Sequence, residues 1–376
     1  MTETLFIELI RVAIGNQECL SRLPSEREWG KLYKMAEKQS LIGICFAGLR
    51  RLGADANEGF ARIGMSKMQY LNWMGMAFQI QSRNKLVNLQ CAELQAKLFT
   101  DGMHSCILKG QGVGQLYSEH LHDLRQSGDI DVWIDAEKKD VIAYVEQTNH
   151  NGDVDISSKH IELSLFRDTV VEAHFVPANS NVPIIGRRVK AYYDEQKVRQ
   201  MGHKVMLDTG QDIVAPTADF QAIHILQHAF GHFLFEGIGL RQLLDYYFVM
   251  NQPFSEDEKT SIVKTLKSLK LNRFAQGVAY ILTEVFGAKE CFIPVDENIG
   301  KRILKSVMEG GNFGKYYKKR SSKKVDSSWY RFWYHNVRMW KFFDMSPWII
   351  AMSPFTRIYE YFWRFSHGYF KNRRKQ

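Results

Sequence analysis

The sequence predicts an α+β fold in which a small mixed sheet lies between helical N-terminal and C-terminal regions. Apolar residues recur at helical spacing over residues 1–100 and again after Thr217. Between these regions, short apolar segments alternate with polar residues, as half-buried strands do. The strand-like segments do not alternate regularly with helices, so a regular βαβ series is not predicted.

Helices are predicted for the first hundred residues. Apolar positions with helical periodicity occupy Leu5–Ile14, Trp29–Ala36 and Ile42–Leu52. Phe60–Leu98 is rich in helix-forming residues and shows no alternation of the kind found in strands. We therefore assign residues 1–100 to a helical N-terminal region.

The pattern changes at Asp101-Gly102, where we place the start of a sheet-containing core over residues 101–210. A helix is predicted between two of its strands, at Ala136–Glu146. Arg167-Asp168-Thr169 separates two alternating segments and predicts a hairpin. The segments predicted as strands are His104–Leu108, Ile130–Ile134, Ile161–Phe166, Val170–Val176 and, less regularly, Lys204–Leu207.

Residues 211–310 form a predicted helical domain. Its expected helices are Ala218–Phe230, Gly239–Met250, Glu256–Leu269 and Arg273–Val285. Gly310-Gly311 ends this domain and begins a basic, aromatic tail, residues 311–376.

The net charge of +9 resides in the tail, because residues 315–376 hold 15 Lys and Arg against 3 Asp and Glu. The same segment carries 19 aromatic residues. Three interpretations remain open: packing of the tail on the core, peripheral contact with a membrane surface, and nucleic-acid binding. Packing is the one we favour, and nucleic acid the one we favour least. Lys371–Lys375 is expected to be a solvated end.

Cysteine usage and the N-terminus predict a cytoplasmic protein. The five cysteines are scattered, odd in number and free of CxxC spacing, which argues against a disulfide framework or a structural zinc site and favours a reducing compartment. The N-terminus lacks the basic start of a signal peptide and carries Glu3 and Glu8. The aromatic tail leaves membrane association open.

Glycines follow the first predicted strand, in the sequence Gly110-Gln-Gly112-Val-Gly114. This spacing fits neither a dinucleotide-binding loop nor a phosphate-binding P-loop, which ends in Gly-Lys-Ser/Thr. A strand-to-helix turn that needs small residues is the simpler interpretation.

Asp129 and Asp131 carry the chemistry. Residues i and i+2 of a strand point to the same face, about 6.6 Å apart. Glu172 and His174 lie on one face of a later predicted strand. Two divalent cations held by three carboxylates neutralise phosphate charge and align the attacking and leaving oxygens in phosphoryl transfer. Oxygen ligands select Mg²⁺ or Mn²⁺, and Arg125 is placed to meet a phosphate.

An ordered set of motifs resembles the polymerase-β-type nucleotidyltransferases, and within them a bacterial branch of uncharacterised nucleotidyltransferases. The set is a strand, "LKG", "LY", an Arg, "DIDVWI", "VEAHF" and "GIGLRQLLDYY", and it spans roughly residues 101–250. The resemblance implies that residues 101–210 form a nucleotidyltransferase catalytic core. It also implies that Asp129, Asp131 and Glu172 hold the metals, and that Lys109 and Gly110 contact the triphosphate. Lys109-Gly110 departs from the usual Gly-Gly/Ser turn.

The resemblance further implies transfer of a nucleoside monophosphate from an NTP such as ATP to a hydroxyl acceptor, with release of pyrophosphate. The acceptor is not specified, and a saccharide is one candidate because members of this branch are associated with surface-polysaccharide biosynthesis. The alternatives are a catalytically inactive member that binds nucleotide or a partner, and a peripheral membrane scaffold.

Two further sets of residues, three histidines and an Arg/Asp pair, could serve either the fold or the site. His224, His228 and His232 recur every four residues, so one zinc ion cannot take all three, and partner-bonded histidines are the simpler interpretation; His224 and His228 are candidates to face the cleft. Arg241 and Asp245 are spaced to pair along a helix; a contact from Arg241 to the triphosphate is the functional alternative.

Overall fold

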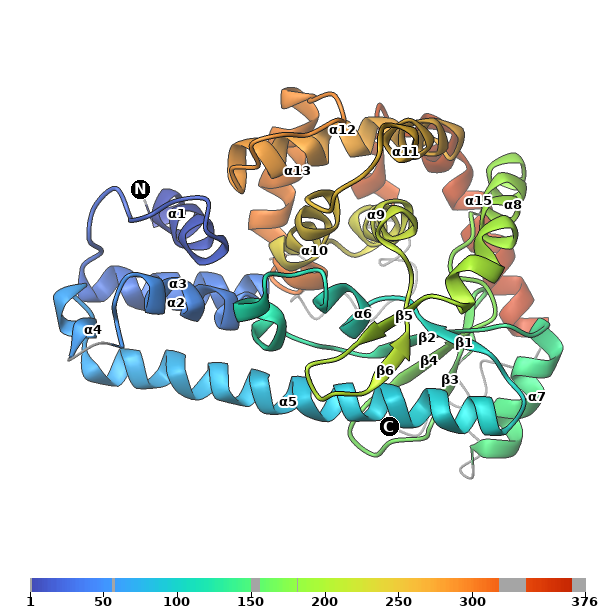
Figure 1. Cartoon of the computed structure of the whole chain (residues 1–376). Coiled ribbons are helices and arrows are strands. Elements are labelled where there is room, and N and C mark those ends of the chain that lie inside the picture. Colours follow the sequence, from blue (N-terminus) through green and yellow to red (C-terminus); the bar gives the residue numbers. More distant parts are fainter. Residues whose placement is uncertain (1, 56–57, 150–155, 181, 318–335, 367–376) are drawn as a thin grey trace.

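A four-stranded mixed sheet lies at the centre of the computed structural model, which describes residues 2–55, 58–149, 156–180, 182–317 and 336–366 (Figure 1). The strand order is β1-β2-β4-β3, with β2 and β4 parallel and the outer strands antiparallel to their neighbours. The strands are β1 (Ser105–Ile107), β2 (Ile130–Ile134), β3 (His160–Leu163) and β4 (Val171–His174). The predicted α+β class, the mixed sheet and the β3–β4 hairpin are confirmed.

Alternating side chains of β2 pack on opposite faces of the sheet. Ile130 and Val132 are buried in one apolar cluster together with Val171 of β4. Trp133 is buried on the other face, where its ring stacks on Phe220 with centroids 6.2 Å apart. Because both faces are covered, the position of every β2 side chain is determined by the pleat.

The N-terminal region is helical, and α5 connects it to the sheet. The helices are α1 (Thr2–Ile14), α2 (Glu26–Gln39), α3 (Ile42–Arg51), α4 (Gly59–Arg62) and α5 (Lys67–Thr100). α5 has 34 residues and is therefore about 51 Å long at 1.5 Å per residue. It begins at a capping box formed by Ser66 and Gln69. Along its length it contacts α3 at one end and β1 and β6 at the other (Figure 1).

Several elements around the sheet were not predicted from the sequence. Helix α8 (Pro183–Met201) buries few apolar residues, chiefly Ile185, Val189 and Tyr193, so its helical periodicity is weak. Strand β5 (Lys204–Met206) was expected, but it pairs with β6 (Asp212–Val214) in a separate two-stranded sheet. The remaining elements of the core are α6 (Gln111–Gly114), the 3₁₀ helix η1 (Glu119–Leu124) and α7 (Lys138–Thr148).

The C-terminal helices lie over the face of the sheet that carries Trp133, with α9 nearest to the strands (Figure 1). They are α9 (Ala218–Phe235), α10 (Leu240–Met250), α11 (Glu256–Ser268), α12 (Asn272–Tyr280), the π-helical η2 (Ile281–Val285), α13 (Glu297–Gly310), the short η3 (Asn312–Gly314) and α15 (Pro347–Ser366). The four predicted helices of this domain correspond to α9, α10, α11 and the α12–η2 pair.

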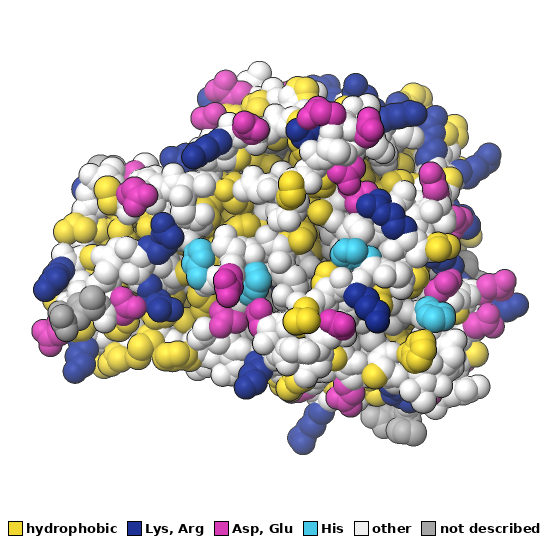
Figure 2. All heavy atoms as spheres, in the orientation of Figure 1, with side chains coloured by type: hydrophobic (Ala, Val, Ile, Leu, Met, Phe, Trp, Pro, Cys, Tyr) yellow, Lys and Arg dark blue, Asp and Glu magenta, His cyan; other side chains and the backbone are white. Residues whose placement is uncertain are grey.

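The described part of the tail packs on these helices. Met339 and Phe342 are buried in the core, and Arg338 donates hydrogen bonds to the carbonyls of Phe233 and Glu236. Trp348 keeps most of its surface exposed. Lys371–Lys375 lies outside the described residues. Within the described ranges no helix is both long enough and apolar enough to span a bilayer. Acidic and basic side chains are interspersed on the face shown in Figure 2.

Candidate active site

A tight turn after β1 brings Lys109 beside the second strand. The Leu108 N–H donates to the Asp131 carbonyl at 2.9 Å, so the chain leaves β1 next to β2. Gly110 has φ of 63°, a conformation that glycine adopts without strain. A Cβ at Gly112 would lie 2.9 Å from the Ala215 side chain. The glycines therefore serve a strand-to-helix turn and close packing, in agreement with the simpler interpretation of the sequence.

Three carboxylates from two neighbouring strands meet at one end of the sheet. Asp129 directly precedes β2, Asp131 lies within it, and Glu172 is the register partner of Asp131 on parallel strand β4. One oxygen from each of the three lies within 4.8 Å of the other two. We call Asp129, Asp131 and Glu172 the carboxylate cluster.

The charges of the cluster are unequally compensated. Burial opposes ionisation of Asp131, but Lys109 and His174 outweigh it and lower its pKa to about 2. Burial also opposes ionisation of Glu172, yet contacts with His160 and His174 hold its pKa below the usual range. Asp129 keeps solvent-exposed surface, but partial loss of hydration and the charge of Asp131 raise its pKa. The cluster thus carries negative charge that its neighbours do not fully balance.

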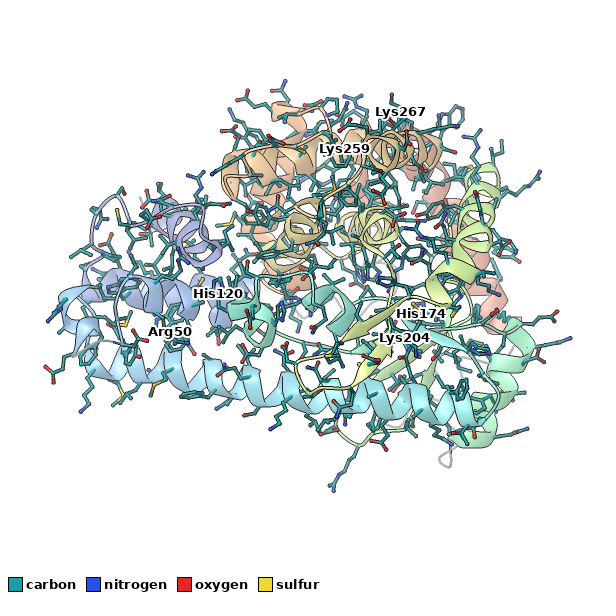
Figure 3. All side chains as sticks on the ribbon, viewed as in Figure 1. Arg50, His120, His174, Lys204, Lys259 and Lys267 are labelled. Carbon is teal, nitrogen blue, oxygen red and sulfur yellow. The ribbon has the colours of Figure 1, made fainter. Side chains whose placement is uncertain are left out.

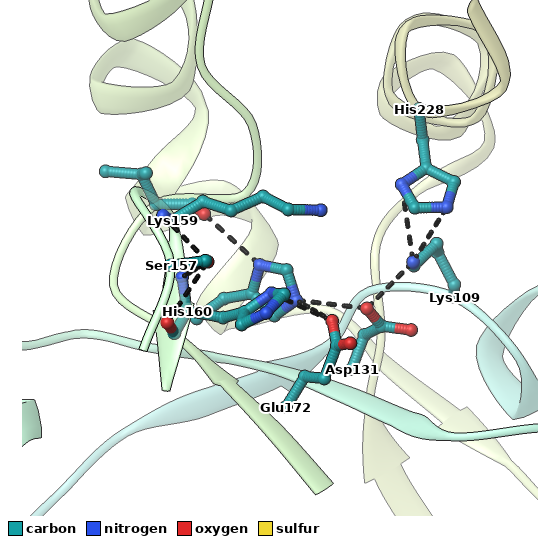
Figure 4. Close-up of polar contacts among 9 residues, drawn as sticks. Lys109, Asp131, Ser157, Lys159, His160, Glu172 and His228 are labelled. Carbon is teal, nitrogen blue, oxygen red and sulfur yellow. Dashed lines mark hydrogen bonds and ion pairs between the residues drawn. The ribbon is translucent and has the colours of Figure 1, made fainter. Parts of the chain in front are cut away.

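Lys109 joins the cluster to helix α9. Its Nζ lies 2.7 Å from Asp131 Oδ1 and donates to His228 Nε2 at 3.0 Å (Figure 4). Burial and the neighbouring Lys109 charge lower the pKa of His228 well below its usual value. His228 is therefore a neutral acceptor, as the simpler interpretation of the three histidines expects.

His224 lies one turn earlier on α9 and is fully buried. Its Nδ1 lies 3.2 Å from the Tyr193 hydroxyl, whereas its Nε2 has no hydrogen-bond partner among the described residues. Burial, followed by Lys109 and His174, lowers its pKa well below the usual value. His224 and His228 thus both lie on the side of α9 that faces the cluster.

Two imidazoles cover the other side of the carboxylate cluster. His174 Nε2 lies 3.0 Å from Asp131 Oδ1 and 3.3 Å from Glu172 Oε2. His160 Nδ1 lies 2.9 Å from the same Glu172 oxygen. Figure 3 shows His174 in the interior of the molecule, whereas Lys267 projects from the surface of α11.

Arg125 is bound within a second charged group. Its Nε and Nη2 donate to the two oxygens of Asp245 at 2.6 and 2.8 Å, and the Tyr117 hydroxyl donates to Asp245 Oδ1 at 2.7 Å. We call Tyr117, Arg125 and Asp245 the Asp245 cluster. Arg125 Nη1 is buried and has no hydrogen-bond partner in the described part of the chain. The predicted contact of Arg125 with phosphate is untested.

Arg241 is not the main partner of Asp245, although the i,i+4 spacing predicted that pair. Its Nη1 instead donates to the Gln126 carbonyl at 3.0 Å, between the two charged groups. The reason is geometric, because the Arg125 fork binds both carboxylate oxygens of Asp245. A contact from Arg241 to triphosphate remains a prediction.

A cavity of about 320 Å³ is bounded by Lys159 and His228, and none of the three carboxylates lines it. Lys159 and His228 line its edge beside the cluster, and the segment after β4, including Asn179, forms one wall. Burial and the nearby Lys109 charge lower the pKa of Lys159. Much of the remaining lining is apolar and comes from α9, from α15 and from Leu269 and Leu271 between α11 and α12.

Comparison with protein families gives one result, and it covers more of the chain than the motifs did. A family model described as an uncharacterised nucleotidyltransferase matches residues 25–287. The chain belongs to this family. The match includes α2 to α5 as well as the core and the helices from α8 to η2. Comparison with curated proteins and with solved structures gave no match.

Lys159 and His160 are site residues that sequence reasoning missed. His160 pairs in register with His174 across the β3–β4 hairpin, and their rings lie 4.9 Å apart. The sequence predicted the β3–β4 hairpin, but it placed the start of the first strand at Ile161 and did not assign the register. His160 was therefore not expected to face His174. A single-residue register shift would move His160 to the other face.

Proposed function

We propose that this nucleotidyltransferase-family protein transfers a nucleoside monophosphate from an NTP to a hydroxyl acceptor and releases pyrophosphate. The observation that carries the proposal is the convergence of Asp129, Asp131 and Glu172 oxygens within 4.8 Å of one another. In the reaction, the acceptor oxygen bonds to the α-phosphorus while the bond from that phosphorus to the β-phosphate oxygen breaks. Pyrophosphate keeps the electron pair of the broken bond, and the proton of the acceptor hydroxyl passes to solvent water.

The donor set fits Mg²⁺ or Mn²⁺, which prefer carboxylate oxygens. Burial, followed by the charge of Asp131, raises the pKa of Asp129, and a cation bound among the three carboxylates would oppose both effects. When bound, the metal supplies charge neutralisation at the triphosphate and alignment of the reacting oxygens. The lowered pKa of Glu172 favours its role as a ligand over that of a general base, because a base works best with a pKa near the working pH.

The residues around the carboxylate cluster suggest where the two substrates would bind. Lys109 lies on the β1 side and offers an ammonium group to phosphate oxygens after exchange of its contact with Asp131. The cavity beside Lys159 and His228 supplies room for the acceptor or the nucleoside. A saccharide is one candidate acceptor.

The test uses the full chain, α-³²P-labelled NTPs and a cell extract as the source of acceptors. Asp131→Asn is expected to reduce labelling and pyrophosphate release roughly 10³-fold, the value of several kcal/mol of lost metal stabilisation. The matched control is Asp135→Asn, which removes a partly exposed carboxylate paired with Lys197. Equal labelling by wild type and Asp131→Asn would refute the proposal.

A second candidate function is nucleotide binding without turnover. It is favoured by one observation, the direct pairing of Lys109 with Asp131 in place of a small phosphate-turn residue. Calorimetric titration with MgATP, MgCTP, MgGTP and MgUTP separates the two. Saturable binding without pyrophosphate release in the presence of extract supports the second candidate.

A further inference from the structure

We propose that His160, Glu172 and His174 form a second metal site, which shares Glu172 with the carboxylate cluster and takes a divalent transition-metal ion in preference to Mg²⁺. One ligand atom from each of the three residues lies within 4.8 Å of the other two. The set consists of two imidazole nitrogens and one carboxylate. That combination binds zinc in hydrolytic enzymes and other first-row transition ions, whereas Mg²⁺ selects oxygen.

The hydrogen bond of His174 fixes the direction of its free nitrogen. Nδ1 lies 3.3 Å from the Val176 carbonyl oxygen, which can only accept, so Nδ1 carries the proton. In the neutral ring, Nε2 then has no proton and carries a lone pair. A histidine that ligates a metal typically donates its other ring N–H to a backbone carbonyl in this way.

The lone pair of His174 faces two carboxylate oxygens. Nε2 lies 3.0 Å from Asp131 Oδ1 and 3.3 Å from Glu172 Oε2, and the side chain is 1% exposed. Asp131 Oδ1 also lies 2.7 Å from the Lys109 ammonium, which can only donate, so this oxygen is already an acceptor and does not donate to Nε2. Three lone-pair donors at these distances repel unless a cation lies among them or the ring gains a second proton.

His160 also places a ring nitrogen beside a carboxylate oxygen, and this contact likewise needs a cation or a proton between the two atoms. Its Nδ1 lies 2.9 Å from Glu172 Oε2, yet this buried atom makes no hydrogen bond with any described residue. For metal–ligand bonds of about 2.1 Å, neighbouring ligand atoms are separated by about 3.0 to 3.4 Å in octahedral or tetrahedral geometry. The distances from Glu172 Oε2 to the two nitrogens are 2.9 and 3.3 Å, one just below that range and one within it.

The register of the hairpin builds this site. His160 on β3 and His174 on β4 are paired residues, and Glu172 precedes His174 by two positions, on the same face of β4. All three ligands therefore come from adjacent strands instead of loops. A site on such a scaffold holds its ligands near one geometry before the metal arrives.

The experiment measures metal binding by the full chain and does not depend on catalysis. Co²⁺ is titrated while its visible d–d absorption is recorded, and the Mn²⁺ complex is examined by electron spin-echo spectroscopy for ¹⁴N coupling. We expect bound Co²⁺ with nitrogen ligation and Mn²⁺ coupled to imidazole nitrogen. His160→Ala and His174→Ala are each expected to weaken Co²⁺ binding at least tenfold. His104→Ala, which removes an exposed histidine, is the control and should leave binding unchanged.

Two results would overturn the inference. The first is bound Co²⁺ whose d–d absorption shows oxygen ligands alone. The second is NMR evidence that His174 carries protons on both nitrogens at neutral pH while Co²⁺ binding is unaffected by His160→Ala. His160 is the safer substitution because it is less buried than His174, and spectroscopy of the wild-type protein needs no variant.

The outcomes separate this inference from the proposed function. Asp129→Asn removes a ligand of the carboxylate cluster alone, so Co²⁺ binding at the histidines should persist while pyrophosphate release is lost. Nucleotidyl transfer supported by Mg²⁺ with no nitrogen-ligated metal would refute the second site and leave the proposed function intact.

Discussion

The carboxylate cluster and the Asp245 cluster both contain buried acidic side chains but differ in how the negative charge is balanced. In the Asp245 cluster, Arg125 and Tyr117 make three hydrogen bonds to one carboxylate, and all three side chains are buried. In the carboxylate cluster, three acidic groups share Lys109, His160 and His174, which is fewer partners for each carboxylate, and Asp129 retains solvent-exposed surface.

The difference indicates which group stabilises the fold and which is available for chemistry. A buried ion pair with three hydrogen bonds to Asp245 joins α10 to the segment before β2, and breaking it leaves a buried charge. Like charges placed together lower stability and are retained where they bind a ligand. The predictions below test that contrast, beginning with the largest expected effect.

Asp245→Asn should lower the free energy of unfolding by about 3–5 kcal/mol, because it leaves the Arg125 guanidinium buried without its counter-charge. The measurement is chemical denaturation at pH 7. The control is Asp344→Asn, which breaks a bidentate pair with Arg302 that is about 40% exposed on both sides. This control substitution should lower the free energy of unfolding by less than about 1 kcal/mol. Equal losses for the two variants would contradict the structural role assigned to the Asp245 cluster.

Lys109→Met should weaken NTP binding about 10- to 100-fold, the value of a lost charged contact with phosphate. Calorimetric titration with a non-hydrolysable NTP analogue and Mg²⁺ measures it. Lys97→Met is the matched control, because it removes a surface lysine that pairs with Asp101. Unchanged NTP affinity together with tighter Mg²⁺ binding would show that Lys109 blocks the metal site instead of serving the triphosphate.

The stabilising effect of Asp245 should depend on pH. Burial opposes its ionisation, but Arg125 outweighs that effect and lowers its pKa. A carboxylate with a lowered pKa adds stability above its unfolded-state pKa of about 3.9, and that stability is lost as the pH falls through the folded-state value. The difference in unfolding free energy between wild type and Asp245→Asn should therefore be constant from pH 7 to pH 5 and shrink below about pH 4. Denaturation curves across this range test it, and a constant difference down to pH 2 would be inconsistent with the lowered pKa.

Asp129→Asn should have the smallest effect on stability and the opposite sign. It removes a negative charge next to Asp131 that the metal-free protein does not compensate. We expect a rise in unfolding free energy of no more than about 1 kcal/mol, because solvent screens the exposed side chain. Thermal denaturation with and without Mg²⁺ measures it, and Mg²⁺ should stabilise the wild type more than the variant. A loss of stability in the metal-free variant would mean that Asp129 is already compensated.

The strands of the core were predictable because their apolar positions are periodic. Ile130 and Val132 alternate with polar residues, and β2 has the predicted bounds. The sequence led us to expect Glu172 beside Asp131 but could not establish the pairing, because the apolar pattern of one strand does not specify which strand lies next to it. Helix α8 escaped prediction because most of its surface is polar and exposed.

The partners of Arg125 and Lys109 were beyond the reach of the sequence. Arg125 is 120 residues from Asp245, and Lys109 is 119 residues from His228. The local spacing of Arg241 and Asp245 suggested a pair that the bidentate Arg125 contact replaced. Contacts of this separation depend on helix packing, which local periodicity does not encode.

The sequence by itself determined the α+β class, the residues of the carboxylate cluster and the family resemblance, because strand alternation and ordered motifs are local properties. Only the tertiary structure decided the register of β3 on β4, the placement of Lys109 between Asp131 and α9, and the meeting of His160 with His174. The physical reason is that a ligand set forms from distances between strands and helices, and those distances are set when both faces of the sheet are packed.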